Sequence, residues 1–414
     1  MSLNPSSNHD SDTYEIEHAS VTDLGMRRQN NQDAIATVTA DRETWHDRGH
    51  FFMVADGMGA HAAGELASQI AVENVPHTYQ KLRNLLPPAA LRQAVHKANE
   101  LIHNKGQSSA EFNGMGTTCS CLVLLPGVAL VAHVGDSRVY RLRSGQLEQL
   151  TFDHSLVWEM AAANHSSAEE VPACIPKNVI TRSLGPHPMV NVDLEGPYQV
   201  LPGDVFLACS DGLTSVVDDR LIGSLIGLLS PQEAIETLVD VANLRGGPDN
   251  ISSIVVRIPG EPETSLGEDQ RATVSFSSKG SVWASLLGWL SGGSGGRSTT
   301  VNNLGGPYGN GPYRFYECET EPAAQKQKEL AADLQALESA PDSPLASRRK
   351  IDWPAFRSTC QLAEQACADG QFADAAVHYS TAIRQIMSQV RAGETSDTTA
   401  HIRATATDEE TRVI

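Results

Sequence analysis

The sequence is short of basic residues, with 31 lysines and arginines against 50 aspartates and glutamates and a formal net charge of −19. A protein that binds nucleic acid through the phosphate backbone needs the opposite balance, and no basic stretch here would supply it. We therefore do not expect nucleic acid as the main ligand. Carboxylates gathered at one site would attract cations, although most of the 50 acidic residues are expected to form a solvated surface.

Cysteine is scarce and unpatterned, with seven residues, an odd number, and no CxxC spacing. Cys119 and Cys121 alternate along an apolar run, so they face the same side of a strand and cannot easily form a disulfide with each other. Histidine and cysteine patterns typical of zinc sites are also missing. Free thiols in a reducing cytosol are the simplest interpretation.

Long apolar stretches are absent as well. None reaches the roughly 18 residues that a membrane-spanning helix needs. The first residues, MSLNPSSNHDSD, contain neither the basic region nor the apolar region of a secretion signal. The sequence therefore predicts a cytoplasmic protein without a transmembrane segment.

The 414 residues are too many for one ordinary core and divide by composition. We expect a main domain over residues 14–258 and a low-complexity linker, rich in Gly, Ser, Thr and Pro, over 259–350. Residues 351–392 again have a helical pattern and are expected to form a hairpin. Residues 1–13 and 393–414 are expected to be disordered.

The main domain combines strand and helix patterns. Helices are predicted over residues 63–75 and 89–104, and a third begins at the capping box SPQE (230–233) and ends at Gly246. Closely spaced strands joined by tight turns must be antiparallel, so we expect an α+β layered fold. The predicted strands are FFMVA (51–55), TTCSCLVLL (117–125), VALVAHV (128–134), DVFLACS (204–210) and ISSIVVRI (251–258).

Two islands interrupt the predicted linker. Residues 281–290 (SVWASLLGWL) form a short apolar patch, and residues 307–318 (PYGNGPYRFYEC) concentrate tyrosines. Each is interpreted either as a docking peptide or as partly ordered linker.

The C-terminal hairpin resembles a single tetratricopeptide repeat. The small and aromatic residues that carry this likeness are Leu362, Ala363, Ala366, Gly370, Phe372, Ala375, Tyr379 and Ala382. One repeat cannot bury its apolar face alone. The hairpin is therefore expected to pack on the main domain or on another copy, or to bind a partner; we favour association.

Four strand-like runs end or turn at an aspartate beside a small residue, namely Asp56, Asp136, Asp211 and Asp249. A single Asp-Gly is an ordinary turn signal, but four such carboxylates at the edge of one core would repel one another. A cation among the four carboxylates would offset this repulsion. Oxygen ligands of this kind suit magnesium or manganese.

Motifs in a fixed order identify a family resemblance. They are RRQNNQDA, VADGMGAHAAGE, GTTCSCLVL, HVGDSRVYRL, LTFDHSL, ITRSLG, ACSDGL and GGPDNISSIVV. Over about residues 14–258 the chain resembles the bacterial branch of the type 2C metal-dependent serine/threonine protein phosphatases. The resemblance implies two packed antiparallel sheets flanked by helices.

The resemblance also implies metal ligands. Asp56 is expected to bridge two metal ions, with the carbonyl of Gly57 completing one ligand shell. Asp211 and Asp249 are expected to hold the second ion. Asp136, together with Asp211, matches the position of a third, looser ion in bacterial members. The expected ions are manganese or magnesium.

Two further residues are assigned by the pattern RxxNxD. Asp33 is expected to orient a water at the ions and counts among the metal ligands, and Arg28 is expected to bind the substrate phosphate. A water shared by two cations loses a proton near neutral pH, and the resulting hydroxide attacks phosphorus directly. No phospho-enzyme is needed, so Ser210 is interpreted as a turn residue.

Phosphoproteins are the expected substrates, in opposition to a bacterial kinase. The alternatives are a phosphoprotein-binding scaffold with little activity and a phosphatase of small phosphorylated metabolites. Comparing the activity on a small chromogenic ester with that on a phosphopeptide would distinguish a protein phosphatase from a phosphatase of small metabolites.

The sequence departs from the family pattern at Met58, where many eukaryotic members have a histidine that can protonate the leaving group. His61 is a substitute, although solvent or a metal-bound water is favoured. Residues 153–178 match a flap over the site in the family. Within or near it, Cys174 is interpreted as a bystander thiol, and Arg182 either adds positive charge to the site or forms a structural salt bridge.

Overall fold

The structure is a computed structural model that describes residues 16–59, 63–176, 178–260, 309–339 and 351–409, with only the backbone for residues 42, 339 and 392–409. It contains two sheets whose neighbouring strands are antiparallel. The strands are β1 (Glu17–Asp23), β2 (Asp33–Val38), β3 (His50–Met58), β4 (Gly116–Thr117), β5 (Cys119–Leu125), β6 (Val128–Val134), β7 (Arg138–Arg143), β8 (Gln146–Gln149), β9 (Asp193–Gln199), β10 (Val205–Cys209), β11 (Ile251–Arg257) and β12 (Arg314–Glu317).

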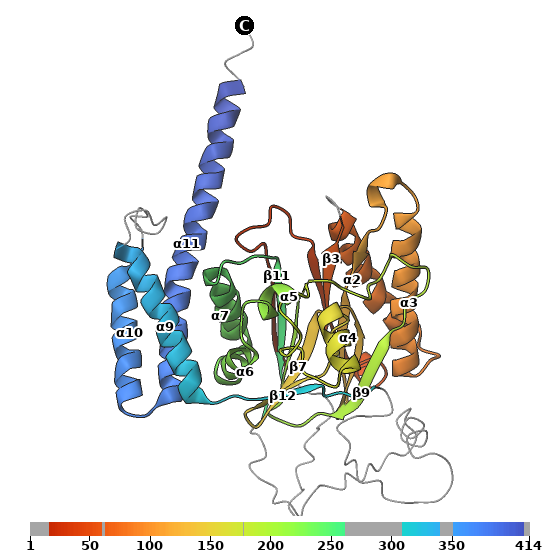
Figure 1. Ribbon diagram of the computed structural model, residues 1–414, viewed down its shortest axis with the longest axis horizontal. Helices are drawn as coiled ribbons and strands as arrows, with labels where there is room; N and C mark the ends of the chain where they lie inside the picture. Colours follow the sequence, from red (N-terminus) through yellow and green to blue (C-terminus); the bar gives the residue numbers. More distant parts are fainter. Residues whose placement is uncertain (1–15, 60–62, 177, 261–308, 340–350, 410–414) are drawn as a thin grey trace, which may run out of the picture.

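Helices cover the outer faces of both sheets (Figure 1). One sheet has the order β1-β11-β10-β7-β8-β12, and the other has β2-β3-β5-β6-β9 with β4 paired to β3. The described helices are α1 (Arg42–Trp45), α2 (Ala63–Lys81), α3 (Pro87–Gly106), the 3₁₀ helix η1 (Ala110–Phe112), α4 (Leu156–Ala163), α5 (Asp211–Thr214), α6 (Asp219–Leu228), α7 (Pro231–Leu244), α9 (Thr320–Ser339), α10 (Trp353–Ala368) and α11 (Phe372–Glu409). The predicted α+β sandwich is confirmed.

Central strands are buried on both faces. Every residue of β5 is buried, because one face packs on the other sheet and the other packs under α2 and α3. Phe52, Leu122 and Phe206 fill the space between the sheets. Apolar runs without alternation, such as CSCLVLL, follow from this double burial.

The three predicted helices are present. α7 begins at the expected capping box, in which the Ser230 hydroxyl accepts from the backbone of Glu233 while the Glu233 carboxylate accepts from the Ser230 backbone. α2 continues past residue 75, where the prediction ends it, through Pro76 to Lys81. The buried Tyr79, whose hydroxyl donates to the Arg48 carbonyl at 3.0 Å, holds this last turn against the domain.

The predicted linker contains regular structure. β12 and α9 lie within residues 259–350, so the prediction of a low-complexity linker is wrong for these elements. α9 buries Ala323, Leu330 and Leu334 at helical spacing, a stripe that the polar composition around it concealed. The apolar island 281–290 lies outside the described residues.

The disordered tail predicted from residue 393 is also wrong as far as Glu409, because the helix of the hairpin continues to that residue. No proline occurs between Phe372 and Glu409 to end it. Figure 1 shows α11 extending beyond the rest of the molecule.

The C-terminal helices pack on the main domain beside α6 and α7 (Figure 1). Phe356, Tyr379 and Ile383 are buried in the same cluster as Ile222 and Leu238. Arg384 pairs with Glu233, and Arg391 pairs with the buried Asp240. The apolar face of the hairpin is therefore covered within the chain, while association with a partner and the tetratricopeptide likeness stay predictions.

Residues 309–318, the described part of the second island, dock on the chain itself. β12 pairs antiparallel with β8, with Arg314 opposite Gln149 and Glu317 opposite Gln146. On α6 a Cβ atom at Gly223 would overlap the sulfur of Cys318, so this glycine allows the segment to approach the helix closely. Among the described helices, none has both the length and the apolar composition that crossing a membrane requires.

Candidate metal centre

The predicted aspartates meet at one end of the sandwich. Asp33, the first residue of β2, lies opposite Asp56 near the end of β3. Asp211 lies two residues after the end of β10, and Asp249 lies shortly before its antiparallel neighbour β11. Asp136 lies in the turn between β6 and β7. Antiparallel pairing thus gathers carboxylates that are far apart in the sequence.

Asp33, Asp56, Asp136 and Asp211 are buried or half-buried and disfavour one another's charge, whereas the Asp249 side chain is 33% exposed. Burial raises the pKa of Asp33 to about 7 against the opposing effect of a hydrogen bond from Ser210. Burial, together with the Asp211 charge, raises the pKa of Asp136 to about 8. The pKa of Asp56 lies well above its usual value because of burial and then the charge of Asp33. Burial and the Asp249 charge also raise the pKa of Asp211.

The donor set fits a hard cation. One buried carboxylate oxygen of Asp33, of Asp136 and of Asp211 (Oδ1 in each) has no hydrogen-bond partner. Such oxygens are costly unless a donor or a cation faces them. Within the described ranges no three His, Cys, Asp or Glu side chains are arranged as a group that could hold a metal ion. Oxygen-only ligands of this kind suit magnesium or manganese.

Ser210 holds Asp33 in place. Its fully buried hydroxyl donates to Oδ2 of Asp33 at 2.7 Å and accepts from the backbone N–H of Ser252 at 3.0 Å. Sequence reasoning treated Ser210 only as a turn residue and missed this contact. Because both interactions engage the hydroxyl oxygen, the serine is positioned as a support for Asp33.

Two threonines fix the end of β3. The N–H of Asp56 donates to Oγ1 of Thr118 at 2.8 Å, and its carbonyl accepts from Oγ1 of Thr117 at 2.9 Å and from the N–H of Thr118 at 2.8 Å. Sequence reasoning did not assign either threonine to the site. The feature of the sequence that could have indicated them is the pair Thr117-Thr118 at the start of an apolar run.

Gly57 lies where a side chain has no room. A Cβ atom at residue 57 would overlap the carbonyl oxygen of Gly64 and lie 2.5 Å from that of Gln32. The N–H of Gly57 donates to the same Gln32 carbonyl at 3.1 Å. The sequence predicted glycine here to free its carbonyl for a cation; the structure adds a packing requirement.

Arg28 reaches the site from a surface loop. Its Nη2 lies 2.7 Å from Oδ2 of Asp249, and 49% of the arginine side chain is exposed. Asn250 holds this loop: its Oδ1 accepts from the N–H of Gln32 at 2.8 Å, and its Nδ2 donates to the Leu24 carbonyl at 2.9 Å. Sequence reasoning missed Asn250, although it stands in the quoted motif directly after Asp249.

The segment predicted as a flap begins and ends beside the aspartates. At its start, the N–H of His154 donates to the carbonyl of Gly135, the residue before Asp136, at 2.7 Å. Just beyond its end, Leu184 exchanges two backbone hydrogen bonds with Thr117, at 2.9 and 3.1 Å. The flap is therefore joined at both ends to the backbone that carries the site.

The remaining predicted residues are less central. Arg182 donates to Asp193 at 2.6 Å, which is the salt-bridge alternative. Cys174 is exposed and forms no disulfide. Met58 lies half-buried at the end of β3, and His61 lies outside the described residues.

The raised carboxyl pKa values predict how the metal-free protein responds to pH. Folded Asp136 has a pKa of about 8 against 3.8 for the ordinary group, so it favours folding at low pH and loses that contribution as pH rises. In chelator, Asp136→Asn is expected to melt about 5 °C above the wild type near pH 8.5, and close to it near pH 4. Thermal melts across this range, with the exposed α9 variant Asp333→Asn as control, would measure the gap; a pH-independent gap would contradict the prediction.

The main domain is similar in sequence to known proteins. A family model described as protein phosphatase 2C matches residues 26–240. The chain is 35% identical over 240 residues to a putative protein phosphatase 2C-type of Streptococcus pyogenes, covering 57% of this chain and 94% of that protein. It is 35% identical over 246 residues to protein phosphatase PhpP of Streptococcus pneumoniae, covering 58% and 97%.

Solved structures give the same result. The Mycobacterium tuberculosis serine/threonine phosphatase PstP/Ppp superposes with a TM-score of 0.52 at 31% identity, covering 59% of this chain and 99% of that one. A structure of the catalytic domain of PstP in complex with two manganese ions has a TM-score of 0.50 at 29% identity, with the same coverage. The family match ends at residue 240, so β12 and the C-terminal helices lie outside it.

Proposed function

Because the chain belongs to the protein phosphatase 2C family, we propose that it hydrolyses phosphoserine and phosphothreonine in proteins with the help of divalent cations. The observation that carries this proposal is the meeting of buried aspartates with raised pKa values and unpartnered oxygens at one end of the sandwich. Carboxylates that repel one another so strongly either take up protons or are stabilised by positive charge among them.

The residues that would hold two ions are Asp33, Asp56, the carbonyl of Gly57, Asp211 and Asp249, and Asp136 with Asp211 would hold a third. Manganese or magnesium fits this oxygen set, and a relative bound to two manganese ions supports the first. When bound, such ions activate water at neutral pH and offset the negative charge of a phosphoryl group.

The chain's own residues would place the substrate. The half-exposed guanidinium of Arg28 lies at the rim beside Asp249, where its flat, forked donors suit phosphoryl oxygens. Asn250 fixes the loop that carries it. The Ser210 hydroxyl is engaged with Asp33, so the site offers no serine nucleophile there. Met58 cannot donate a proton, so we assign protonation of the leaving group to solvent.

The relatives are bacterial serine/threonine phosphatases, which supports a role opposing a bacterial serine/threonine kinase. We place the protein in the cytoplasm because all seven of its cysteines are free thiols, as expected in a reducing compartment.

The test is phosphate release from a phosphothreonine peptide by the full chain. We expect turnover with manganese, none in excess chelator, and recovery when manganese is restored. A higher kcat/KM for the peptide than for a small chromogenic phosphate ester supports a protein substrate. Preference for the ester would indicate small metabolites, and a folded, manganese-bound protein without turnover would indicate a phosphoprotein-binding scaffold.

A further inference from the structure

Residues 309–318, which we call the strap, cross from one sheet to the other. At one end, the carboxylate of Glu195 on β9 accepts from the Tyr313 hydroxyl at 2.5 Å and from the Gly311 N–H at 3.1 Å. Glu195 is 2% exposed, so this anchor is internal. At the other end β12 extends the opposite sheet by pairing with β8. The strap is therefore held by both layers of the domain.

Arg314 of the strap contacts the flap directly. Its guanidinium lies 4.2 Å from the centre of the Trp158 ring on α4, and its Nη1 lies 2.9 Å from Oε1 of Glu169. The Tyr313 ring meets Phe152 edge-on at 5.5 Å. The Arg314 side chain is only 18% exposed, which strengthens its attraction to the ring, whereas Glu169 is 68% exposed and adds little.

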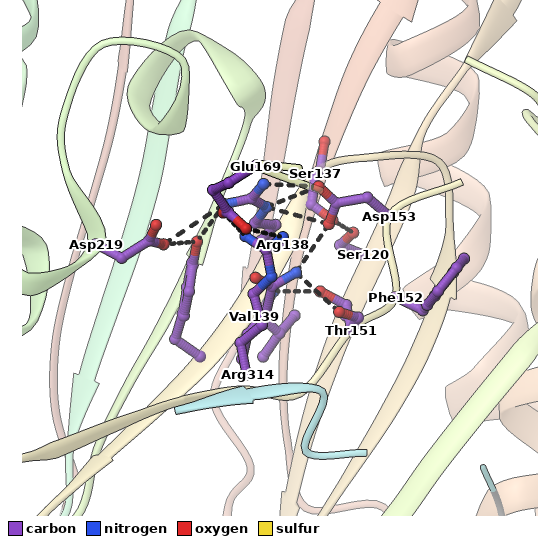
Figure 2. A network of polar contacts seen from close by, with 12 residues as sticks. Ser120, Ser137, Arg138, Val139, Thr151, Phe152, Asp153, Glu169, Asp219 and Arg314 are labelled. Carbon is purple, nitrogen blue, oxygen red and sulfur yellow. Dashed lines mark hydrogen bonds and ion pairs between the residues drawn. The ribbon is translucent and has the colours of Figure 1, made fainter. Parts of the chain in front are cut away.

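The same part of the flap is connected to the metal centre. Arg138, two residues after Asp136, lies 5.8 Å from the Trp158 ring and pairs with Asp153 at 2.7 Å. Figure 2 shows Arg138, Asp153, Glu169 and Arg314 within one network of polar contacts. Trp158 is thus contacted by one arginine from the strap and by one that begins β7, two residues after the candidate metal ligand Asp136.

We propose that Arg314 is a positioning residue for the flap, and that recognition of the phosphoprotein depends on it. The inference rests on the proposed function, since it assigns a substrate-binding role to the flap. Arg314 stacks on the Trp158 ring and pairs with Glu169, so the strap holds these two parts of the flap in one arrangement. A residue beyond the family match would in this way tune how well the enzyme binds peptide.

The kinetic test compares two substrates with full-length variants. Arg314→Ala is expected to raise KM for a phosphothreonine peptide about fivefold, the loss expected for a shielded arginine on tryptophan, with kcat changed less than about twofold. A small phosphate ester has no peptide chain for the flap to contact, so it should keep its KM and kcat. Arg314→Lys retains the charge but not the flat stacking surface, so an intermediate KM is expected.

The matched control is Arg357→Ala. Arg357 also lies in the C-terminal part and pairs with a glutamate, Glu338, at 2.8 Å, but on α10, away from the strap. Arg357→Ala should leave KM and kcat unchanged for both the peptide and the ester. Equal losses on peptide and ester by Arg314→Ala would indicate general damage and overturn the proposal, as would unchanged peptide kinetics.

Amide hydrogen exchange gives a readout that needs no turnover. The backbone amides of α4 should exchange several times faster in Arg314→Ala than in the wild type. In Arg357→Ala their exchange rates should be unchanged. If the wild type releases no phosphate, the proposed function fails while exchange still decides whether Arg314 holds the flap. Unchanged exchange in Arg314→Ala would overturn the inference.

Discussion

An Asp56→Asn variant is expected to release phosphate about 1000-fold more slowly than the wild type at saturating manganese, equivalent to about 4 kcal/mol of lost transition-state stabilisation. Asp56 is the carboxylate expected to bridge two ions, and burial, followed by the charges of Asp33, Asp211, Asp136 and Asp249, raises its pKa. Asparagine keeps the shape but removes the negative charge that would attract cations to this position.

The same substitution should not weaken the metal-free fold. Removing one buried charge from a cluster of mutually repelling carboxylates relieves repulsion, so the melting temperature in chelator should stay equal or rise. Manganese should then raise the melting temperature less in the variant than in the wild type. Phosphate release and paired melts measure both effects, and Asp333→Asn on the outer surface of α9 should change neither. Turnover within tenfold of the wild type would argue against a bridging role.

Gly57→Ala is expected to lower the free energy of unfolding by about 3 kcal/mol, or roughly 10 °C in melting temperature, and to abolish most activity. The new methyl group would overlap the carbonyl of Gly64 and lie 2.5 Å from that of Gln32. Both obstacles are backbone atoms, which cannot rotate away as a side chain can. β3 or the loop before β2 must therefore shift, and Asp56 shifts with it.

Chemical denaturation measures this loss. Gly106→Ala at the end of α3 is the control, since its nearest atom, the Phe112 carbonyl oxygen, lies 3.3 Å from a Cβ and alanine favours helix. Its stability should stay within about 1 kcal/mol of the wild type. If Gly57→Ala is as stable as Gly106→Ala, the prediction is wrong, and the backbone at the end of β3 can shift to accept a methyl group at little cost.

The aspartates of the centre could be found in the sequence because each follows or precedes an apolar run, a purely local pattern. Their supports could not. Asn250 holds the backbone of Gln32, a residue 218 positions earlier, and Ser210 holds Asp33 across 177 positions. Only the folded sheets bring these partners together, so no spacing rule identifies them.

Two elements, α6 and β12, were not predicted from the sequence for a similar reason. α6 contains Gly223 and Gly227, which weaken a helix pattern, yet Gly223 is needed for the close approach of Cys318. β12 has four residues and pairs with β8, the edge strand of its sheet in the main domain. Its position depends on a vacancy in the sheet, which its own sequence does not encode.

That vacancy has a consequence for the nascent chain. β8 leaves the ribosome long before β12, its only neighbour on that side of the sheet within the described residues. At bacterial rates of about 5–20 residues per second, the edge stays open for on the order of ten seconds. During this interval it is a template for pairing with another chain, as open edges generally are. The strap covers this edge in the folded chain, so the exposed template is removed once β12 has been made and has paired with β8.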